Sequence, residues 1–439
     1  MNEKALQWFY KELPDLVYKG VLTQEAADNL RRYYGGVKGA DKKWLVIMLC
    51  SVFGALLIGL GIILLIGHNW EQLSRALRTV LSLLPLLIAQ GLASWVLLKY
   101  PQSHALKEGT ATFLSLMVGA SIALISQTYN IPNDTPTFLL TWMLLIVPLV
   151  YFMEATIPAG IYIVGVATWT ENFWYYQPLK AFLFWPFLAV IIPHLIGILR
   201  EEKYTHRAAF LTLVMAVSVC FGTGFTLGRT WPSSWMVIFP SLITLFYLLG
   251  AWKFPGASTN WQRPPLVIGG LGIFVFMFLF TYRCPWESIT QPYNYPPNEI
   301  LSPTAIPDHL LTFSLVAGVM LFALQFAKRR DWMRTLFGVL PLMALVGYAL
   351  ATASLSSAFP TSLFNGFLLV VSLYRLITGI RANHLGTINT GMLMLAVLVL
   401  ARFFDSEINF LLKGLVFILI GIGFLVTNVV MLRRKGGAA

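Results

Sequence analysis

Fourteen apolar runs, each about long enough to cross a lipid bilayer, follow one another between Trp44 and Leu432. A hydrocarbon layer about 30 Å thick needs roughly 20 helical residues for each crossing. Only helices and closed barrels satisfy every backbone group inside it, and continuous apolar runs without alternation favour helices. The sequence therefore predicts an all-α fold, a polytopic transmembrane helix bundle of about 14 spans.

Two of the predicted spans, 137–153 and 157–170, are short, with Glu154 between them and with Pro158 and Gly160 at the start of the second. An alternative is that these two form one re-entrant pair, which lowers the number of spans to twelve without changing the sidedness of later loops. The predicted spans are 44–67, 79–98, 108–126, 137–153, 157–170, 180–199, 208–228, 234–252, 265–282, 309–327, 332–354, 359–378, 386–401 and 411–432.

Lysine and arginine are distributed unevenly among the predicted loops. If the chain starts in the cytoplasm, 24 of the 31 basic residues lie on the cytoplasmic side and 7 on the other. Such a bias follows the positive-inside rule, so we expect both termini in the cytoplasm. The same threading accounts for the net charge of +12 without a nucleic-acid partner.

The predicted organisation has four parts: a cytoplasmic helical hairpin at 1–43, nine spans within 44–283, a proline-rich outer loop at 284–308 and five spans within 309–435. In the hairpin, Lys19-Gly20 predicts the end of the first helix, and Thr23 can cap a second helix that reaches Tyr34. The hairpin is either an amphipathic cap that anchors the first span or a surface that binds a cytoplasmic protein partner.

Proline and glycine give two further local predictions. Six prolines between Cys284 and Asp308 predict an extended segment without a regular helix. Gly269, Gly270 and Gly272 form a small-residue stripe in the ninth span, which predicts close packing against another helix.

Charged residues are absent from the centres of the predicted spans, where ion-coupled transporters usually place them. The polar side chains within the spans are few. We expect Gln90 and Asn365 to form hydrogen bonds between helices, the usual role of such residues, and the alternative is that they bind a substrate. Glu154, His194 and Asn365 are the candidates for functional polar groups near the membrane edge, against an ordinary interfacial or structural role for each.

Polar and aromatic side chains collect instead at the predicted outer ends of several spans. Aromatic belts at membrane interfaces explain many of the rings, but they do not explain the carboxylates. We therefore predict an outer cup that binds an amphipathic ligand such as a lipid head group or a glycan. The predicted substrate-binding residues are Asn69, Trp70, Glu71, Gln127, Tyr129, Asn130, Asp134, Glu171, Trp174 and Asp405.

Two stretches resemble a known family. Asn69-Trp70-Glu71 and the run from Gly119 to Tyr129 are similar to the DUF2157 group of bacterial predicted membrane proteins, over roughly residues 5–170. Residues 380–435 resemble, less closely, a carboxyl-terminal module that accompanies this group. The resemblance implies a multi-pass protein of the bacterial inner (cytoplasmic) membrane, and it carries no known activity and no residue role.

Three functions remain open on the sequence. The first is the binding or translocation of a lipid, or of another amphipathic or lipid-linked substrate, without obvious ion coupling. Membrane lipids are predicted partners of the protein in any case. The second is a membrane sensor or assembly scaffold with the outer cup and the cytoplasmic hairpin as its two binding surfaces. The third is an intramembrane transferase with Asp134, Glu171 and Asp405 as acid and base. No nucleotide-binding or hydrolase motif, catalytic residue, metal site or cofactor is predicted.

Overall fold

The computed structural model describes residues 3–34 and 70–403, with gaps at 133, 202, 228–232, 257–258, 291–305 and 355, and six positions between 411 and 422. Every regular element in these residues is helical, as predicted. The chain divides into two compact units, Met1–Val80 and Leu81–Ala439.

The first unit contains the predicted hairpin. Helix α1 (Glu3–Tyr18) ends just before Gly20, whose φ of +71° turns the chain, and α2 (Gln24–Tyr34) follows. The Thr23 hydroxyl accepts a hydrogen bond from the Ala26 amide at 3.3 Å. The predicted helix stop and helix cap are therefore confirmed. The cytoplasmic location of the hairpin stays a prediction.

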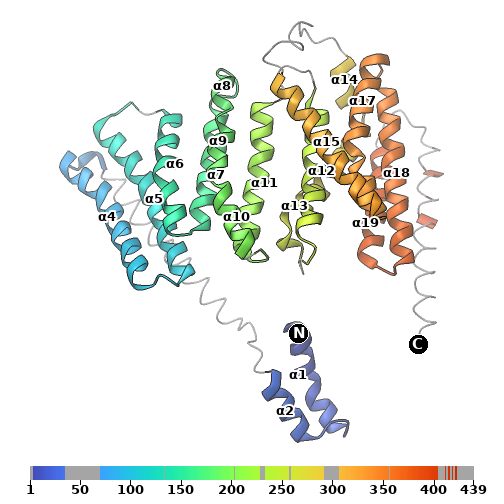
Figure 1. Ribbon diagram of the computed structural model, residues 1–439, viewed down its shortest axis with the longest axis horizontal. Helices are drawn as coiled ribbons and strands as arrows, with labels where there is room; N and C mark the ends of the chain where they lie inside the picture. The colour runs from blue at the N-terminus through green and yellow to red at the C-terminus, as the bar shows by residue number, and fades with distance from the viewer. Residues whose placement is uncertain are drawn as a thin grey trace. The chain divides into compact units, whose positions relative to one another are not determined.

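The long helices of the second unit run in alternating directions (Figure 1). Ten segments of the described chain are long and apolar enough to cross a membrane, and α7 and α13 are shorter, with 16 residues each. The elements are α4 (Arg75–Lys99), α5 (His104–Tyr129), α6 (Thr135–Phe152), α7 (Thr156–Glu171), α8 (Pro178–Ala181), α9 (Phe184–Ala189), α10 (Ile192–Glu201), α11 (His206–Thr226), α12 (Trp235–Lys253), α13 (Pro264–Leu279), α14 (Cys284–Thr290), α15 (Ile306–Lys328), α16 (Trp332–Gly338), α17 (Leu340–Ser354), α18 (Ala358–Arg381) and α19 (Leu385–Phe403).

Twelve of the fourteen predicted spans coincide with described helices or groups of helices, whereas 44–67 lies outside the described residues and 411–432 lies almost entirely outside them. The total of fourteen therefore stays a prediction. The spans 137–153 and 157–170 correspond to two separate helices, α6 and α7, joined by a three-residue turn.

Two predicted spans are not single helices. The span 180–199 is divided into α8, α9 and α10, and 332–354 is divided into α16 and α17. Each break lies two to four residues before a proline, at Pro186, Pro193 and Pro341. A proline ring collides with the carbonyl of the residue four positions earlier, which explains the interruptions.

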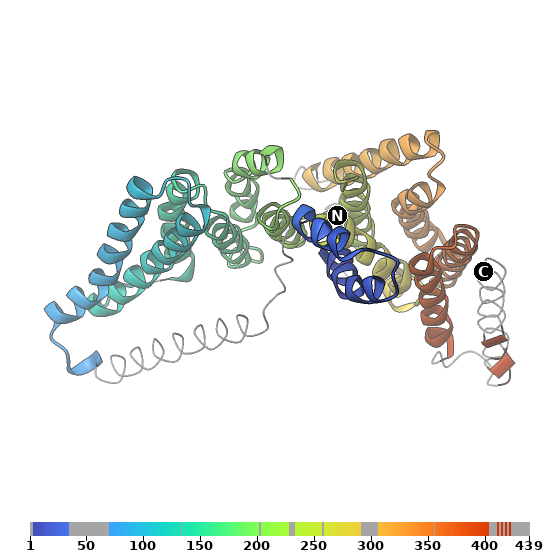
Figure 2. The same cartoon turned by 90° about the horizontal axis from the view of Figure 1, so that it is seen from below.

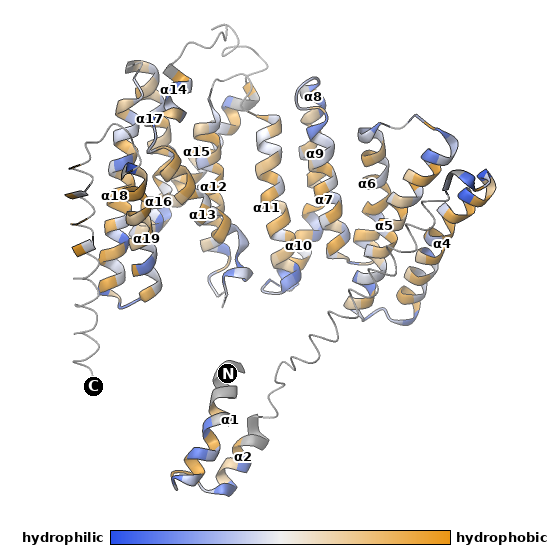
Figure 3. Cartoon of the chain, turned by 180° about the vertical axis from the view of Figure 1, so that it is seen from behind, coloured by the Kyte–Doolittle hydropathy of each residue, from blue (hydrophilic) through white to orange (hydrophobic). Residues whose placement is uncertain are grey.

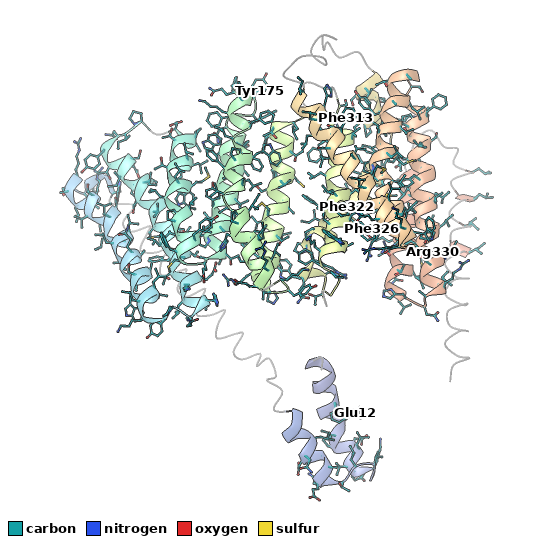
Figure 4. The ribbon with its side chains drawn as sticks, viewed as in Figure 1. Glu12, Tyr175, Phe313, Phe322, Phe326 and Arg330 are labelled. Atoms are coloured by element: carbon teal, nitrogen blue, oxygen red, sulfur yellow. The ribbon has the colours of Figure 1, made fainter. Side chains whose placement is uncertain are left out.

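The alternation gathers many basic residues at one end of the helices. We call this the basic end; it holds the loops after Lys99, Glu201, Lys253, Lys328 and Arg381. Figure 4 labels Arg330 at the basic end and Tyr175 at the opposite end. Figure 3 shows hydrophilic colour concentrated at the helix ends and hydrophobic colour along the helices. The pattern is that of a multi-pass membrane protein.

The region from α12 to α19 has a densely packed interior. Trp286, Phe280 and Phe364 are fully buried, and their ring centroids lie 5.0–5.6 Å apart. The backbones of α12 and α13 approach so closely that a Cβ added to Gly269 would lie only 2.4 Å from the Tyr247 backbone nitrogen. The packing role predicted for the glycine stripe is confirmed.

The prediction that no regular helix forms between Cys284 and Asp308 was wrong at both ends. Residues Cys284–Thr290 form α14, and α15 begins at Ile306. Pro285 lies in the first turn of α14, where a helix does not need its missing N–H. Trp286 is buried in the core and donates its indole hydrogen to the Phe280 carbonyl at 3.0 Å.

Candidate functional site

A groove runs along α4, α5 and α6, which lie side by side in Figures 1 and 2. Its volume is about 640 Å³, and its lining is mostly apolar. We call it the α4–α6 groove. It is lined by Leu83, Leu86, Gln90, Leu114, Val118, Ser121, Ile122, Ile125, Ser126, Ile131, Pro132, Thr137, Phe138, Thr141, Leu145 and Leu149.

One wall of the groove is set by the contact of α5 with α6. The Trp142 ring lies over Gly119, where an added Cβ would come within 2.7 Å of the ring. The Trp142 indole nitrogen donates a hydrogen bond to the Ser115 carbonyl at 2.8 Å. A glycine is needed here because any side chain would displace the ring.

The other wall is set by the contact of α4 with α5. The Ser121 hydroxyl donates a hydrogen bond to the Ser82 carbonyl at 2.7 Å. Ala89 and Ala93 of α4 are buried in a small apolar cluster that also contains Ala111 of α5. Small residues and an interhelical hydrogen bond are typical of helix contacts inside a membrane.

Polar groups are few in the α4–α6 groove, and most are satisfied by the chain itself. The Thr141 hydroxyl donates to the Thr137 carbonyl, and the Ser126 hydroxyl donates to the Ile131 carbonyl. Gln90 differs, because its exposed amide has no hydrogen bond with the described part of the chain. The bond between helices that we expected for Gln90 is absent there, so its amide is available to a ligand.

Four residues of the predicted cup lie in the turn between α5 and α6, beside one end of the groove. Gln127 and Tyr129 are exposed on the last turn of α5, and Asn130 ends the helix with a φ of +51°. Asp134 is the residue before α6, and hydrogen bonding with the Thr137 side chain lowers the pKa of its carboxyl. Thr137 itself lines the groove, so the Asp134 carboxylate lies next to the opening.

Glu171 and Trp174 lie at the same end of the helices but belong to a different surface. Glu171 lines a second groove between α7 and α11, and Trp174 contacts Phe225 of α11 at a ring distance of 6.3 Å. The described residues thus divide these members of the predicted cup between two grooves.

The remaining cup residues lie elsewhere or outside the description. Trp70 is buried and belongs to the first unit, not to the unit that contains the two grooves. The predicted residues Asn69 and Asp405, and the side chain of Glu71, lie outside the described residues.

A polar network at the basic end joins α5, α7 and α11. Both carboxylate oxygens of Glu108 accept backbone hydrogen bonds at the start of α7, from Thr156 at 2.9 Å and from Ile157. Arg207 donates to the Thr156 hydroxyl at 3.0 Å and to the Glu154 carbonyl. The Glu108 carboxylate therefore satisfies orphan amides and the positive end of α7.

Glu154 lies in this network, in the turn between α6 and α7, with a φ of +53°. Its carboxylate forms an ion pair with Lys107 at 3.3 Å. The sequence singled out Glu154 but missed its neighbours Glu108 and Arg207. No local pattern signals them, because residues about 50 to 100 positions apart must be brought together by the fold.

The amino-terminal part of the chain, which includes α4–α6, matches a known protein family. Residues 14–159 match the DUF2157 family. The family is described as a predicted membrane protein, and the resemblance expected from the sequence is confirmed over this range. The match covers about a third of the chain, and the resemblance at 380–435 stays a prediction. No curated protein and no solved structure matches the chain.

The DUF2157 match contains every lining residue of the α4–α6 groove. The run from Gly119 to Tyr129 that carried the resemblance forms the carboxyl-terminal part of α5. Within it, Gly119 receives the Trp142 ring and Ser121 bonds to α4. One of the stretches that suggested the family therefore builds part of the walls of the groove.

Two predicted polar candidates lie beyond the DUF2157 match. Asn365 donates hydrogen bonds to the Thr281 carbonyl at 3.1 Å and to the Thr361 carbonyl at 2.8 Å. The first bond connects α18 to the segment that follows α13, so Asn365 has the structural role expected of it. His194 packs edge-on against Tyr151 with ring centroids 6.0 Å apart. Among the described residues, no group of three or more His, Cys, Asp or Glu side chains is placed to hold a metal ion.

Proposed function

We propose that this multi-pass membrane protein binds the hydrocarbon part of a lipid, or of another amphipathic molecule, in the α4–α6 groove. The observation that carries the proposal is the groove itself: about 640 Å³ of mostly apolar space with one unsatisfied amide, Gln90. Its volume is in the range of about 300–1,000 Å³ typical of ligand sites.

The length of the groove suits a chain that enters the bilayer. Thr137 and Leu149 both line it on α6, and twelve residues of helix span about 18 Å. This distance is more than half of a hydrocarbon layer about 30 Å thick. A ligand bound along the groove would therefore reach past the membrane centre.

Selectivity in such a groove cannot come from the hydrophobic effect, because the lipid tails outside are as apolar as the lining. Shape complementarity and hydrogen bonding must supply it. Gln90 offers both a donor and an acceptor, and a hydrogen bond inside a membrane is worth about 0.6–2 kcal/mol. We propose that the ligand carries an ester, amide or hydroxyl group that reaches Gln90.

Movement of the ligand would be uncoupled from ions in this proposal. The charged residues of the described membrane helices lie near helix ends, as Glu108 and Arg207 do. Proton- or sodium-coupled carriers usually need such groups at the bilayer centre. A lateral groove that passes the centre suits passive binding or facilitated movement of an amphiphile.

A groove-filling substitution tests the proposal. Ile122→Trp places an indole in the groove, whereas Leu116→Trp places the same ring on an exposed part of the same helix. Native mass spectrometry after mild extraction should show that I122W loses one tightly held lipid that the wild type and L116W retain. Equal lipid retention by the two variants would reject the groove as a binding site.

Orientation is the second part of the proposal. We place the basic end in the cytoplasm of a bacterial cell, with both termini on that side of the inner membrane, because the described basic loops follow the positive-inside rule. Cys284 is exposed at the opposite end. In a chain with Cys50→Ala and Cys220→Ala, a membrane-impermeant maleimide should label Cys284 in intact cells. Labelling only after lysis would show that the orientation is the opposite of the one proposed.

A sensor or scaffold role is the second candidate, and the hairpin of the first unit favours it. Tyr18 and Val21 are 91% and 67% exposed at the turn between α1 and α2. Two exposed apolar side chains at a helical turn suit contact with a cytoplasmic protein. Tyr18→Ala combined with Val21→Ala should then fail to restore the phenotype of cells that lack the protein, while lipid retention is unchanged. Loss of lipid retention in the same variant would instead join the hairpin to the groove.

The transferase alternative has no assembled site in the described residues. Asp134 lies beside the α4–α6 groove and Glu171 lines the groove between α7 and α11, and no hydrogen bond joins the two residues. An acid and a base must reach the same substrate atoms to cooperate. Asp405, the third residue proposed, lies outside the described residues.

A further inference from the structure

The groove between α7 and α11 contains features that the α4–α6 groove does not share. Its volume is about 440 Å³, and we call it the α7–α11 groove. It is lined by Val164, Ala167, Thr168, Glu171, Leu213, Val214, Val217, Ser218, Phe221 and Phe225.

Ser218 is the first of these features. It is only 4% exposed, and its hydroxyl has no hydrogen-bond partner in the described chain, although it lines the groove. Hydroxyls in helices usually bond to the carbonyl four residues earlier, as Thr212 and Thr223 do on the same helix. A buried polar group without a partner is costly. The Ser218 hydroxyl is therefore ready for a polar atom of a ligand.

Glu171 is the second feature. Its exposed carboxylate lines the end of the groove opposite the basic end, and it forms no ion pair or hydrogen bond with the described residues. In contrast, Glu108 and Glu154 at the basic end both have partners. One helical turn, about 5 Å, separates Glu171 from the groove residue Thr168. A carboxylate left unpaired beside an apolar groove attracts a cation attached to an apolar body.

Aromatic rings surround the same end of the groove. Phe221 and Phe225 both line it, with their rings stacked 6.3 Å apart, and Trp174 packs against Phe225. Ring faces attract ammonium groups through the cation–π interaction, most strongly for tryptophan. A carboxylate with neighbouring aromatic rings is a chemical match for an ammonium ion.

We infer that the α7–α11 groove binds a phospholipid whose head group carries an ammonium ion. The ammonium pairs with Glu171, and an acyl chain lies along Val164, Val214 and Val217. The Ser218 hydroxyl, deeper than Glu171, donates a hydrogen bond to an ester carbonyl of the lipid. Charge complementarity selects such a lipid over an anionic one, because an anionic head group would face the Glu171 carboxylate.

This inference does not depend on the proposed function, since the α7–α11 and α4–α6 grooves share no lining residue. The test uses the full chain in nanodiscs containing equal amounts of phosphatidylethanolamine and phosphatidylglycerol. Lipids retained after transfer to mild detergent are then counted by native mass spectrometry. We expect the wild type to retain phosphatidylethanolamine severalfold over phosphatidylglycerol.

Variants make the test local to the groove. Glu171→Gln should reduce the ethanolamine preference severalfold, and Ser218→Ala should weaken retention of that lipid without changing which head group is preferred. Glu201→Gln, an exposed carboxylate at the basic end, should keep the wild-type preference. So should I122W, which separates this site from the α4–α6 groove. Equal retention of both lipids by the wild type, or an unchanged preference in E171Q of unchanged thermal stability, would overturn the inference.

Discussion

The helices α4–α6 and the helices α12–α19 are similarly apolar in sequence but pack in different ways. In the most apolar part of α12, 61% of the residues are buried inside the protein, against 22–28% for α4, α5 and α6. The contrast centres on α12, because α15, which packs on it, is also only 22% buried. The α12 helix contacts α11, α13, α15, α16 and α17, whereas α4–α6 leave a groove between them. Hydrophobicity places both sets in the membrane, but it does not distinguish a packed core from a ligand-binding surface.

Side-chain size explains the difference. In the packed region, glycines on α13 let two backbones meet, and large rings from α13, α14 and α18 fill the remaining space. In the open region, alanines and serines join the helices along narrow contacts, and medium-sized aliphatic side chains line the space between. The packed region is suited to rigid support, and the open region is suited to binding.

The largest expected effect comes from removing a ring of the packed region. Trp286→Ala should destabilise the protein by about 3–5 kcal/mol, because it empties a fully buried site between Phe280 and Phe364. Trp95→Ala, on a half-exposed residue of α4, should cost only a small fraction of this. Thermal unfolding in detergent measures both. Equal losses would remove the contrast between the two regions.

A pair of glycine substitutions gives the next largest effect. Gly269→Ala places a Cβ against the Tyr247 backbone, which cannot move aside easily, and should cost about 2 kcal/mol. Gly91→Ala on α4 meets no atom within 4 Å and should be neutral or slightly stabilising through helix propensity. If G91A lowered the melting temperature as much as G269A, α4 would be packed against something in the native protein.

The network at the basic end links the open region to α11, and its loss should have a moderate effect. Glu108→Gln removes the charge that accepts the Thr156 and Ile157 amides, and should cost about 1.5 kcal/mol. The control is Glu201→Gln, which changes an exposed carboxylate at the same end. Hydrogen exchange at the first turn of α7 should rise in E108Q and remain unchanged in E201Q. An unchanged rate in both would show that the Glu108 bonds do not stabilise that turn.

The smallest expected effect concerns pH at the opening of the α4–α6 groove. Because the pKa of Asp134 is lowered in the folded protein, its stabilising charge at the start of α6 is present above the ordinary carboxyl pKa and is lost as pH falls through the lowered value. The Asp134→Asn variant should melt slightly below the wild type at pH 7, and the difference should vanish in acid. A difference that grew in acid would contradict this sign.

The membrane helices could be predicted from the sequence because each span must satisfy its backbone within itself and must be apolar. The cap at Thr23 and the stop at Gly20 were also predictable, since both are local. The breaks in 180–199 and 332–354 could have been found from Pro186, Pro193 and Pro341, whose effect on a helix is equally local.

Contacts between distant residues could not be predicted. In the sequence, Trp286 and Glu171 both lie close to aromatic residues just after a predicted span. The structure buries Trp286 in the core and leaves Glu171 exposed at a groove. Glu108 accepts a hydrogen bond from Thr156, which lies 48 positions later in the sequence. Only the fold therefore reveals that the Glu108 carboxylate binds the first amides of α7.

We propose that α4–α6 bind lipid in a groove, whereas the interior between α12–α14 and α16–α19 is filled by packed side chains. The most direct test is to reconstitute the protein with a phospholipid that carries a photoreactive diazirine in its acyl chain, and to map the adducts by mass spectrometry. We expect adducts concentrated on groove residues such as Ile122 and Leu145, with a smaller set in the α7–α11 groove. Adducts spread evenly over exposed residues such as Leu87 and Leu321, without enrichment in the grooves, would contradict the proposal.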